Sequence, residues 1–125
     1  MSTATLFDRV GGEQFFRTLV DKFYEGVAAD PLLRPMYLDD LVDAREHLAL
    51  FLIQYWGGPP HYASLRGHPR LRRRHAPFAI DDVARDQWLA HMRTALAQMH
   101  DGVEDKDRAE LLSYFEMAAH QLRNR

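Results

Sequence analysis

No cysteine occurs among the 125 residues of the sequence. This absence excludes disulfide bonds, and it excludes every site in which a cysteine thiolate acts as a nucleophile or holds a metal. A run of about 18 apolar residues is also missing, so no integral membrane segment is predicted. The first ten residues lack the apolar core of a secretion signal. These absences favour a cytoplasmic protein.

An excess of charge of one sign is missing as well. The chain has 16 basic and 18 acidic residues and a net charge of −2, which predicts no general attraction to nucleic acid. It contains no glycine-rich nucleotide loop and no P-loop. The histidines do not stand in the spacing of zinc proteases or di-iron bundles. No residue pattern marks a catalytic nucleophile, so the common enzyme signatures are absent.

Apolar residues at helical spacing dominate what is present. A first stripe contains Phe15, Leu19, Phe23 and Val27, and three further stripes cover residues 39–56, about 81–100 and 107–122. The last of these begins with Asp107 and Glu110, a spacing typical of a capping box. No segment alternates with period two. The sequence therefore predicts a single all-α domain over residues 1–125, with four main helices in two antiparallel pairs.

The stretch from Pro59 to about Pro77 has little apolar periodicity, and long irregular segments in small domains are usually functional. It contains several histidines and a cluster of arginines. The arginines fit a solvated loop, a weak phosphate or RNA contact, or a docking surface on a helical module without a cofactor. They also fit a haem site, in which a histidine of this stretch binds the iron and arginines neutralise the propionates.

Five short motifs, in this order and spacing, carry a family resemblance. They are Val10-Gly11-Gly12, Arg34-Pro35-Met36-Tyr37, Gln54-Tyr55-Trp56-Gly57-Gly58-Pro59, residues 66–72 (RGHPRLR) and residues 74–78 (RHAPF). Residues 116–120 (EMAAH) add a sixth. The chain resembles group II truncated haemoglobins, particularly those of actinobacteria, over essentially its full length.

The resemblance implies a truncated globin fold, a 2-on-2 helical sandwich around haem b with an irregular proximal segment. It makes His75 the ligand of the iron. It places Tyr24, Trp88 and Tyr37 as hydrogen-bond donors on the opposite, distal side of the haem, with Ala44 and Leu48 lining the distal pocket. Tyrosine and tryptophan suit this role, because each combines an apolar body with one polar hydrogen.

Further residues are expected to contact the haem. Arg72 is the first candidate for the propionates, followed by Arg74, Tyr62 and His47. His47 has an alternative role as a sixth iron ligand, since neutral imidazole binds haem iron well. Apolar contacts are expected from Leu48, Phe51, Leu71, Phe78, Ile80, Met92 and Phe115.

The resemblance predicts a haem protein for oxygen binding or oxygen transport that also takes carbon monoxide, nitric oxide or other small ligands. The alternative is a haem redox enzyme, either a nitric oxide dioxygenase or peroxidase-like. Sustained turnover of that kind needs a reductase partner, because the chain has no flavin or nicotinamide motif. The sequence leaves the oligomeric state open, a homodimer included. A haem-free helical module is the third hypothesis, and it predicts no haem uptake.

Overall fold

The computed structural model describes residues 4–37, 41–66, 81–99 and 103–122. Two short helices, α1 (Leu6–Arg9) and α4 (His61–Arg66), accompany four long ones. The long helices are α2 (Glu13–Ala28), α3 (Leu41–Tyr55), α6 (Asp82–Ala97) and α7 (Asp105–Leu122), and a 3₁₀ turn, η1, covers Arg34–Met36. The described residues contain no strand. The prediction of an all-α fold is therefore confirmed.

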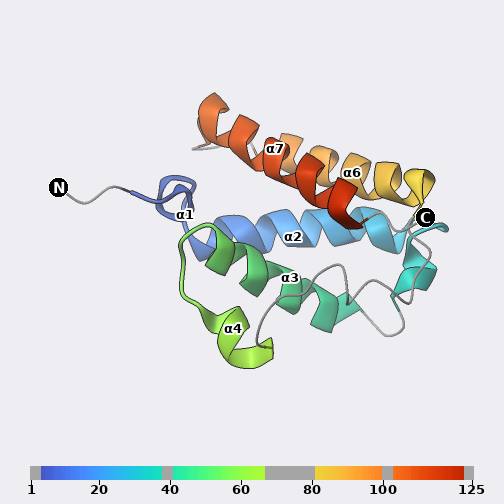
Figure 1. The fold of residues 1–125 in the computed structure, drawn as a ribbon, viewed down its shortest axis with the longest axis horizontal. Helices are drawn as coiled ribbons and strands as arrows, with labels where there is room; N and C mark the ends of the chain where they lie inside the picture. Colours follow the sequence, from blue (N-terminus) through green and yellow to red (C-terminus); the bar gives the residue numbers. More distant parts are fainter. Residues whose placement is uncertain (1–3, 38–40, 67–80, 100–102, 123–125) are drawn as a thin grey trace.

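The four long helices form two antiparallel pairs (Figure 1). Helix α2 packs on α3, and α6 packs on α7. Helix α2 also packs on α6 and so joins the two pairs. This is the 2-on-2 arrangement that the family resemblance implies.

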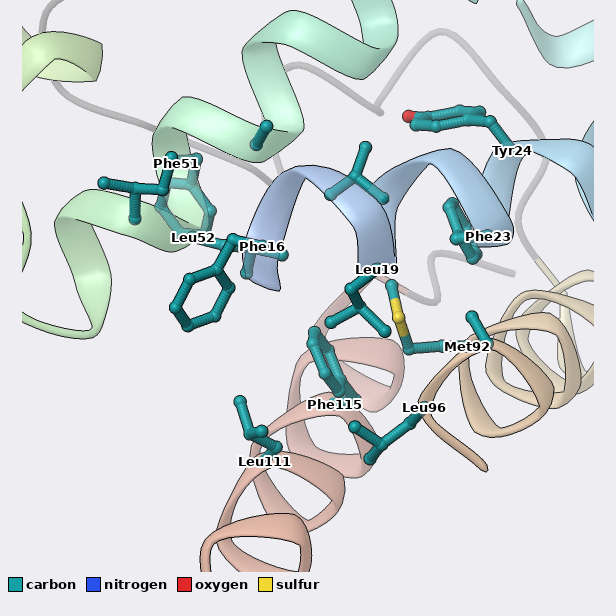
Figure 2. Packing of buried hydrophobic residues seen from close by; sticks show 14 of the residues in the cluster. Phe16, Leu19, Phe23, Tyr24, Phe51, Leu52, Met92, Leu96, Leu111 and Phe115 are labelled. Atoms are coloured by element: carbon teal, nitrogen blue, oxygen red, sulfur yellow. The ribbon is translucent and has the colours of Figure 1, made fainter. Parts of the chain in front are cut away.

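The core lies where α2 meets the other three long helices (Figure 2). Phe16, Leu19 and Phe23 of α2 are completely buried, as are Met92 of α6 and Leu111 of α7. The buried positions of α2 follow the i, i+4 stripe read from the sequence. Burying a large apolar side chain contributes about 1.5–3 kcal/mol, so this shared layer holds the two helix pairs together.

A short N-terminal helix closes one end of the molecule. Thr5 caps α1, and the side chain of Asp8 returns a hydrogen bond to the backbone N–H of Thr5. Gly12, the residue just before α2, has φ of +75°, a backbone conformation that glycine adopts without steric cost. The chain can therefore turn sharply from α1 into α2.

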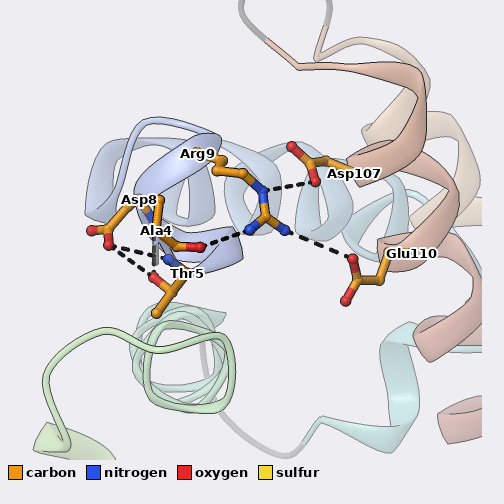
Figure 3. Close-up of polar contacts among 6 residues, drawn as sticks. All are labelled: Ala4, Thr5, Asp8, Arg9, Asp107 and Glu110. Carbon is orange, nitrogen blue, oxygen red and sulfur yellow. Dashed lines mark hydrogen bonds and ion pairs between the residues drawn. The ribbon is translucent and has the colours of Figure 1, made fainter. Parts of the chain in front are cut away.

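Two details of the sequence prediction are wrong. Helix α4 lies inside the stretch from Pro59 to Pro77 that was expected to be irregular; it is too short, at 6 residues, to show an apolar period. Helix α7 begins at Asp105 rather than Asp107. Asp107 is 1% exposed and pairs with Arg9 of α1, with 3.1 Å between Asp107 Oδ1 and Arg9 Nε (Figure 3). An ion pair with the partly exposed Arg9, not a capping box, explains the buried carboxylate at this position.

No helix in the described ranges is long and apolar enough to cross a membrane.

Candidate ligand-binding site

Tyr24 and Tyr37 come together from two neighbouring elements. Tyr24 lies on the last turns of α2 and is 4% exposed, and Tyr37 directly follows η1. Their ring centroids are 5.6 Å apart and the rings are nearly perpendicular. The two hydroxyl groups are hydrogen bonded to each other. Figure 2 shows Tyr24 at the margin of the buried cluster, so the pair borders the core rather than filling it.

The surroundings of the pair keep both hydroxyl groups protonated. Burial raises the pKa of Tyr24, and the neighbouring Tyr37 raises it further. Burial also raises the pKa of Tyr37, whereas its hydrogen bond with Tyr24 lowers that pKa.

A compact corner between α2 and η1 positions Tyr37. Arg34 Nη1 donates to the carbonyl oxygen of Tyr37 at 2.8 Å, and the N–H of Tyr37 donates to the carbonyl oxygen of Arg34 at 3.1 Å. Arg34 is fixed in turn, because its N–H donates to the carbonyl oxygen of Asp30 at 2.9 Å. Hydrogen bonds therefore connect Tyr37 continuously to Asp30.

Asp30 is a buried carboxylate with a full set of donors. Its Oδ1 accepts from the backbone N–H of Leu32 at 2.8 Å and of Leu33 at 3.3 Å. Its Oδ2 lies 2.7 Å from Nε2 of His91 and 3.2 Å from Nε2 of Gln87, both on α6. The hydrogen bond with His91 is the largest cause that lowers the pKa of Asp30. Asp30 thus ties the corner that carries Tyr37 to α6.

Trp88 lies on the same helix, between Gln87 and His91. Its ring centroid is 5.4 Å from that of Phe23 and 6.3 Å from that of Phe115. Trp88 is only half-buried and packs against the edge of the core. The structure therefore brings Tyr24 and Trp88 to the same α2–α6 contact through Phe23, whose ring also lies 4.9 Å from that of Tyr24.

The first half of α3 is less buried than the aromatic residues described above. Ala44, Arg45, His47 and Leu48 are all half-buried. Arg45 lies close enough to Tyr24 for its charge to lower the pKa of that hydroxyl, although burial outweighs this effect. The Nε of Arg45 is buried and has no hydrogen-bond partner among the described residues.

The remaining predicted haem contacts fall into two groups. Phe51 and Tyr62 are buried together, with ring centroids 5.4 Å apart, and Met92 is completely buried near Leu19 and Phe115 (Figure 2). The second group lies outside the described residues: His75, Arg72, Arg74, Leu71, Phe78 and Ile80. For all of them the contact with haem stays a prediction.

Three residues that sequence reasoning missed lie at or behind this site. They are Asp30, His91 and Arg45. Asp30 and His91 are 61 positions apart, and no periodic pattern links positions on different helices. Arg45 directly follows Ala44 on α3, but nothing in the sequence shows that its Nε is buried.

Comparison with known proteins defines the class of this globular fold and site. The model of the bacterial-like globin family matches residues 5–124. A group 2 truncated haemoglobin of Bacillus subtilis is 42% identical over 113 residues, which are 90% of this chain and 84% of the relative. The chain belongs to the bacterial-like globin family.

Solved structures of bacterial haemoglobins have the same fold as this chain. Haemoglobin from the thermophilic phototrophic bacterium Chloroflexus aurantiacus superposes with a TM-score of 0.94 at 48% identity, covering 98% of this chain and 100% of that one. A thermostable haemoglobin from the actinobacterium Thermobifida fusca gives 0.93 at 49%, with 97% and 98% covered. The recognition as a group II truncated haemoglobin is confirmed, and a haem group with a small diatomic ligand follows from the family.

The described residues fit such a haem. In the described ranges no three histidine, aspartate or glutamate side chains gather as a metal site of their own. The buried hydroxyl pair of Tyr24 and Tyr37 and the half-buried indole of Trp88 supply neutral donors. Neutral donors stabilise partial negative charge on a ligand.

Proposed function

We propose that this protein binds oxygen at a haem iron held by His75, and that Tyr24, Tyr37 and Trp88 donate hydrogen bonds to the ligand on the opposite face. The observation that supports this proposal is the buried, mutually hydrogen-bonded tyrosine pair beside Trp88. The haem supplies the iron centre at which the diatomic ligand binds. The side chains around the haem set the affinity of the iron for that ligand.

The tyrosine pair is built to offer one proton to a ligand. Because the hydrogen bond between the two phenols uses only one hydroxyl hydrogen, the other is available for a third group, and either tyrosine can supply it. Both pKa values are raised by burial, so the pair stays neutral at physiological pH. A neutral donor in a buried setting gains more from a partly charged acceptor than it would in water.

Several donors around one ligand predict slow oxygen release. This favours oxygen scavenging or sensing over bulk delivery. A truncated haemoglobin of Bacillus subtilis described as oxygen-avid superposes on this chain with a TM-score of 0.89 at 39% identity, which supports the same reading for the present protein.

Basic side chains are proposed to contact the propionates at the edge of the haem. We place His47 of α3 and Arg72 and Arg74 at the propionates. The His47→Ala variant separates this role from the alternative of a sixth iron ligand. An unchanged ferric spectrum fits the propionate role, whereas loss of a six-coordinate spectrum assigns His47 to the iron.

The visible absorption spectrum of the haem-loaded protein tests the central claim. Wild type is expected to show a sharp Soret band that shifts on reduction and on addition of carbon monoxide. His75→Ala is expected to lose or badly alter this band. His61→Ala replaces an exposed histidine of α4 and serves as the matched control with an unchanged spectrum. An unaltered spectrum in His75→Ala would show that His75 does not bind the iron.

A further inference from the structure

One carboxylate on the corner between α2 and η1 contacts two side chains of α6. Nε2 of His91 lies 2.7 Å from Oδ2 of Asp30, and Nε2 of Gln87 lies 3.2 Å from the same oxygen. The pKa of Asp30 is lowered, and an ionised carboxylate only accepts hydrogen bonds. Nε2 of His91 therefore carries the hydrogen of this contact. We call Asp30, Gln87 and His91 the Asp30 cluster.

The Asp30 cluster is shielded from water. The side chain of Asp30 is 4% exposed and that of His91 is 24% exposed. The second carboxylate oxygen of Asp30 accepts from the backbone N–H groups of Leu32 and Leu33. A buried acceptor that loses its donor costs more free energy than an exposed one. The corner therefore cannot move away from α6 without a loss of stability.

Two of the predicted ligand donors lie on opposite sides of the Asp30 cluster. Trp88 lies three residues before His91 on α6, a spacing that makes the two side chains neighbours on the helix surface. On the other side, the carbonyl oxygen of Asp30 accepts from the N–H of Arg34 at 2.9 Å, and Nη1 of Arg34 donates to the carbonyl oxygen of Tyr37 at 2.8 Å. One fixed carboxylate thus relates the position of Trp88 to that of Tyr37.

Helix α2 leaves room for the imidazole ring of His91 at Gly26. A methyl carbon added to Gly26 would lie 2.5 Å from Nδ1 and 3.1 Å from Cγ of His91. Glycine inside a helix is less stable than alanine, and Gly26 does not have the positive φ that would favour glycine. Close packing of the His91 ring therefore accounts for a glycine at this position.

We propose that His91 is a positioning residue for oxygen retention: by holding Asp30, it sets the distance between Trp88 on α6 and Tyr37 on the corner, so that both can donate to one ligand. This inference rests on the proposed function. Hydrogen bonds weaken steeply when their angle or distance departs from the optimum. A small shift of the corner against α6 would therefore cost the ligand one of its donors.

The haem-loaded His91→Leu variant tests this role, because leucine fills space but donates no hydrogen bond. Oxygen dissociation is expected to become about three- to tenfold faster. The C–O stretching band of the carbon monoxide complex is expected to shift or split, because its frequency depends on hydrogen bonds to the ligand. A purely structural role of His91 would not move this band.

A conservative variant and a matched control accompany His91→Leu. His91→Gln places an amide N–H close to the position of Nε2 and is expected to restore most of the oxygen retention and of the C–O band. Arg93→Ala breaks an exposed ion pair with Glu116, 3.1 Å long, on the same helix, and it should change neither readout.

Gly26→Ala displaces the imidazole ring without removing any group of the Asp30 cluster. It is expected to speed oxygen release and to move the C–O band in the same direction as His91→Leu. In the His91→Ala background the added methyl group has room, so Gly26→Ala should cause no further change there. An equal effect of Gly26→Ala with and without the imidazole ring would overturn the proposal.

Urea denaturation of the full chain, with and without haem, separates this proposal from the proposed function. Asp30→Asn and His91→Leu are expected to reduce stability non-additively, because they remove the same contact. Additive losses, or non-additive losses with an unchanged oxygen dissociation rate and C–O band in His91→Leu, would overturn the role of His91. The Soret band, recorded first for every variant, reports on haem binding. Its absence in wild type would refute the proposed function, whereas the coupling between Asp30 and His91 would still be measured.

Discussion

At the residue scale, ligand retention depends on the hydroxyl groups of Tyr24 and Tyr37. Removing either one with phenylalanine takes away one buried hydrogen bond of about 1–1.5 kcal/mol, so oxygen dissociation is expected to become about five- to twelvefold faster. Stopped-flow displacement of oxygen by carbon monoxide measures this rate. Dissociation of carbon monoxide, whose outer atom carries less negative charge, is the internal control and should change less.

The double variant of the same two tyrosines tests whether they act as a unit. Since one hydroxyl donates to the other, each single change already disturbs the pair, and the two effects should not add. Fully additive effects on the oxygen dissociation rate would show that Tyr24 and Tyr37 act on the ligand independently.

Asp30 sets a pH dependence at the same scale. Its pKa is lowered in the folded protein, chiefly by the hydrogen bond with His91. A carboxylate with a depressed folded pKa adds stability above its unfolded pKa of about 3.9, and this stability is lost as the pH falls through the folded pKa. Asp30→Asn keeps an acceptor for the backbone donors but breaks the contact with His91, so it should lose about 1–3 kcal/mol at pH 7.

Urea denaturation from pH 7 down to about pH 3 checks the Asp30 prediction, because that window spans the unfolded pKa. The difference between wild type and Asp30→Asn should shrink as the solution becomes acidic. A difference that stays constant over this range would mean that the charge of Asp30 contributes nothing. Asp30→Asn should also speed oxygen release, since Asp30 anchors the corner that carries Tyr37.

At the element scale, the Arg9–Asp107 ion pair joins α1 to α7 (Figure 3). Asp107→Ala leaves the guanidinium of Arg9 without its buried partner and should reduce the free energy of unfolding by about 1–3 kcal/mol. Glu110→Ala is the matched control: its carboxylate is half exposed and lies 3.8 Å from Arg9 Nη2, so a change below about 0.5 kcal/mol is expected. Equal losses in urea denaturation would contradict the assignment.

The long helices were predictable from sequence because their buried faces repeat at helical spacing. Phe15, Leu19, Phe23 and Val27 were read as one face, and all four are buried in α2. Asp107 shows the limit of that reading, because a carboxylate three residues before Glu110 satisfies a capping pattern while its real partner lies 98 residues away. The prediction that Tyr24, Tyr37 and Trp88 lie at the ligand site depended on the family motifs. Their spacing in the sequence alone would predict ordinary packing in the hydrophobic core.

At the scale of the whole molecule, the helices differ in how completely their contacts with one another are buried. The contact of α2 with α6 and α7 is completely buried at Phe16, Phe23, Met92 and Leu111. Helix α3 is divided: its second half is buried at Leu52 and Ile53, whereas residues 44, 45, 47 and 48 in its first half are only half-buried. The half-buried turns of α3 are those that carry the predicted distal contacts.

This division predicts where the molecule loosens when haem is removed. A ligand that binds only the folded state adds RT ln(1 + [L]/Kd) to the free energy of unfolding. When that ligand is removed, the segments with few other buried contacts should lose the most local stability. Hydrogen exchange followed by mass spectrometry is therefore expected to speed up more in residues 41–48 than in residues 49–55, with α2 and α7 changing least. The comparison within α3 is the matched control, because both halves belong to one helix. Equal acceleration along all of α3, or faster exchange in α7 than in residues 41–48, would mean that the haem stabilises the fold through the α6–α7 pair instead.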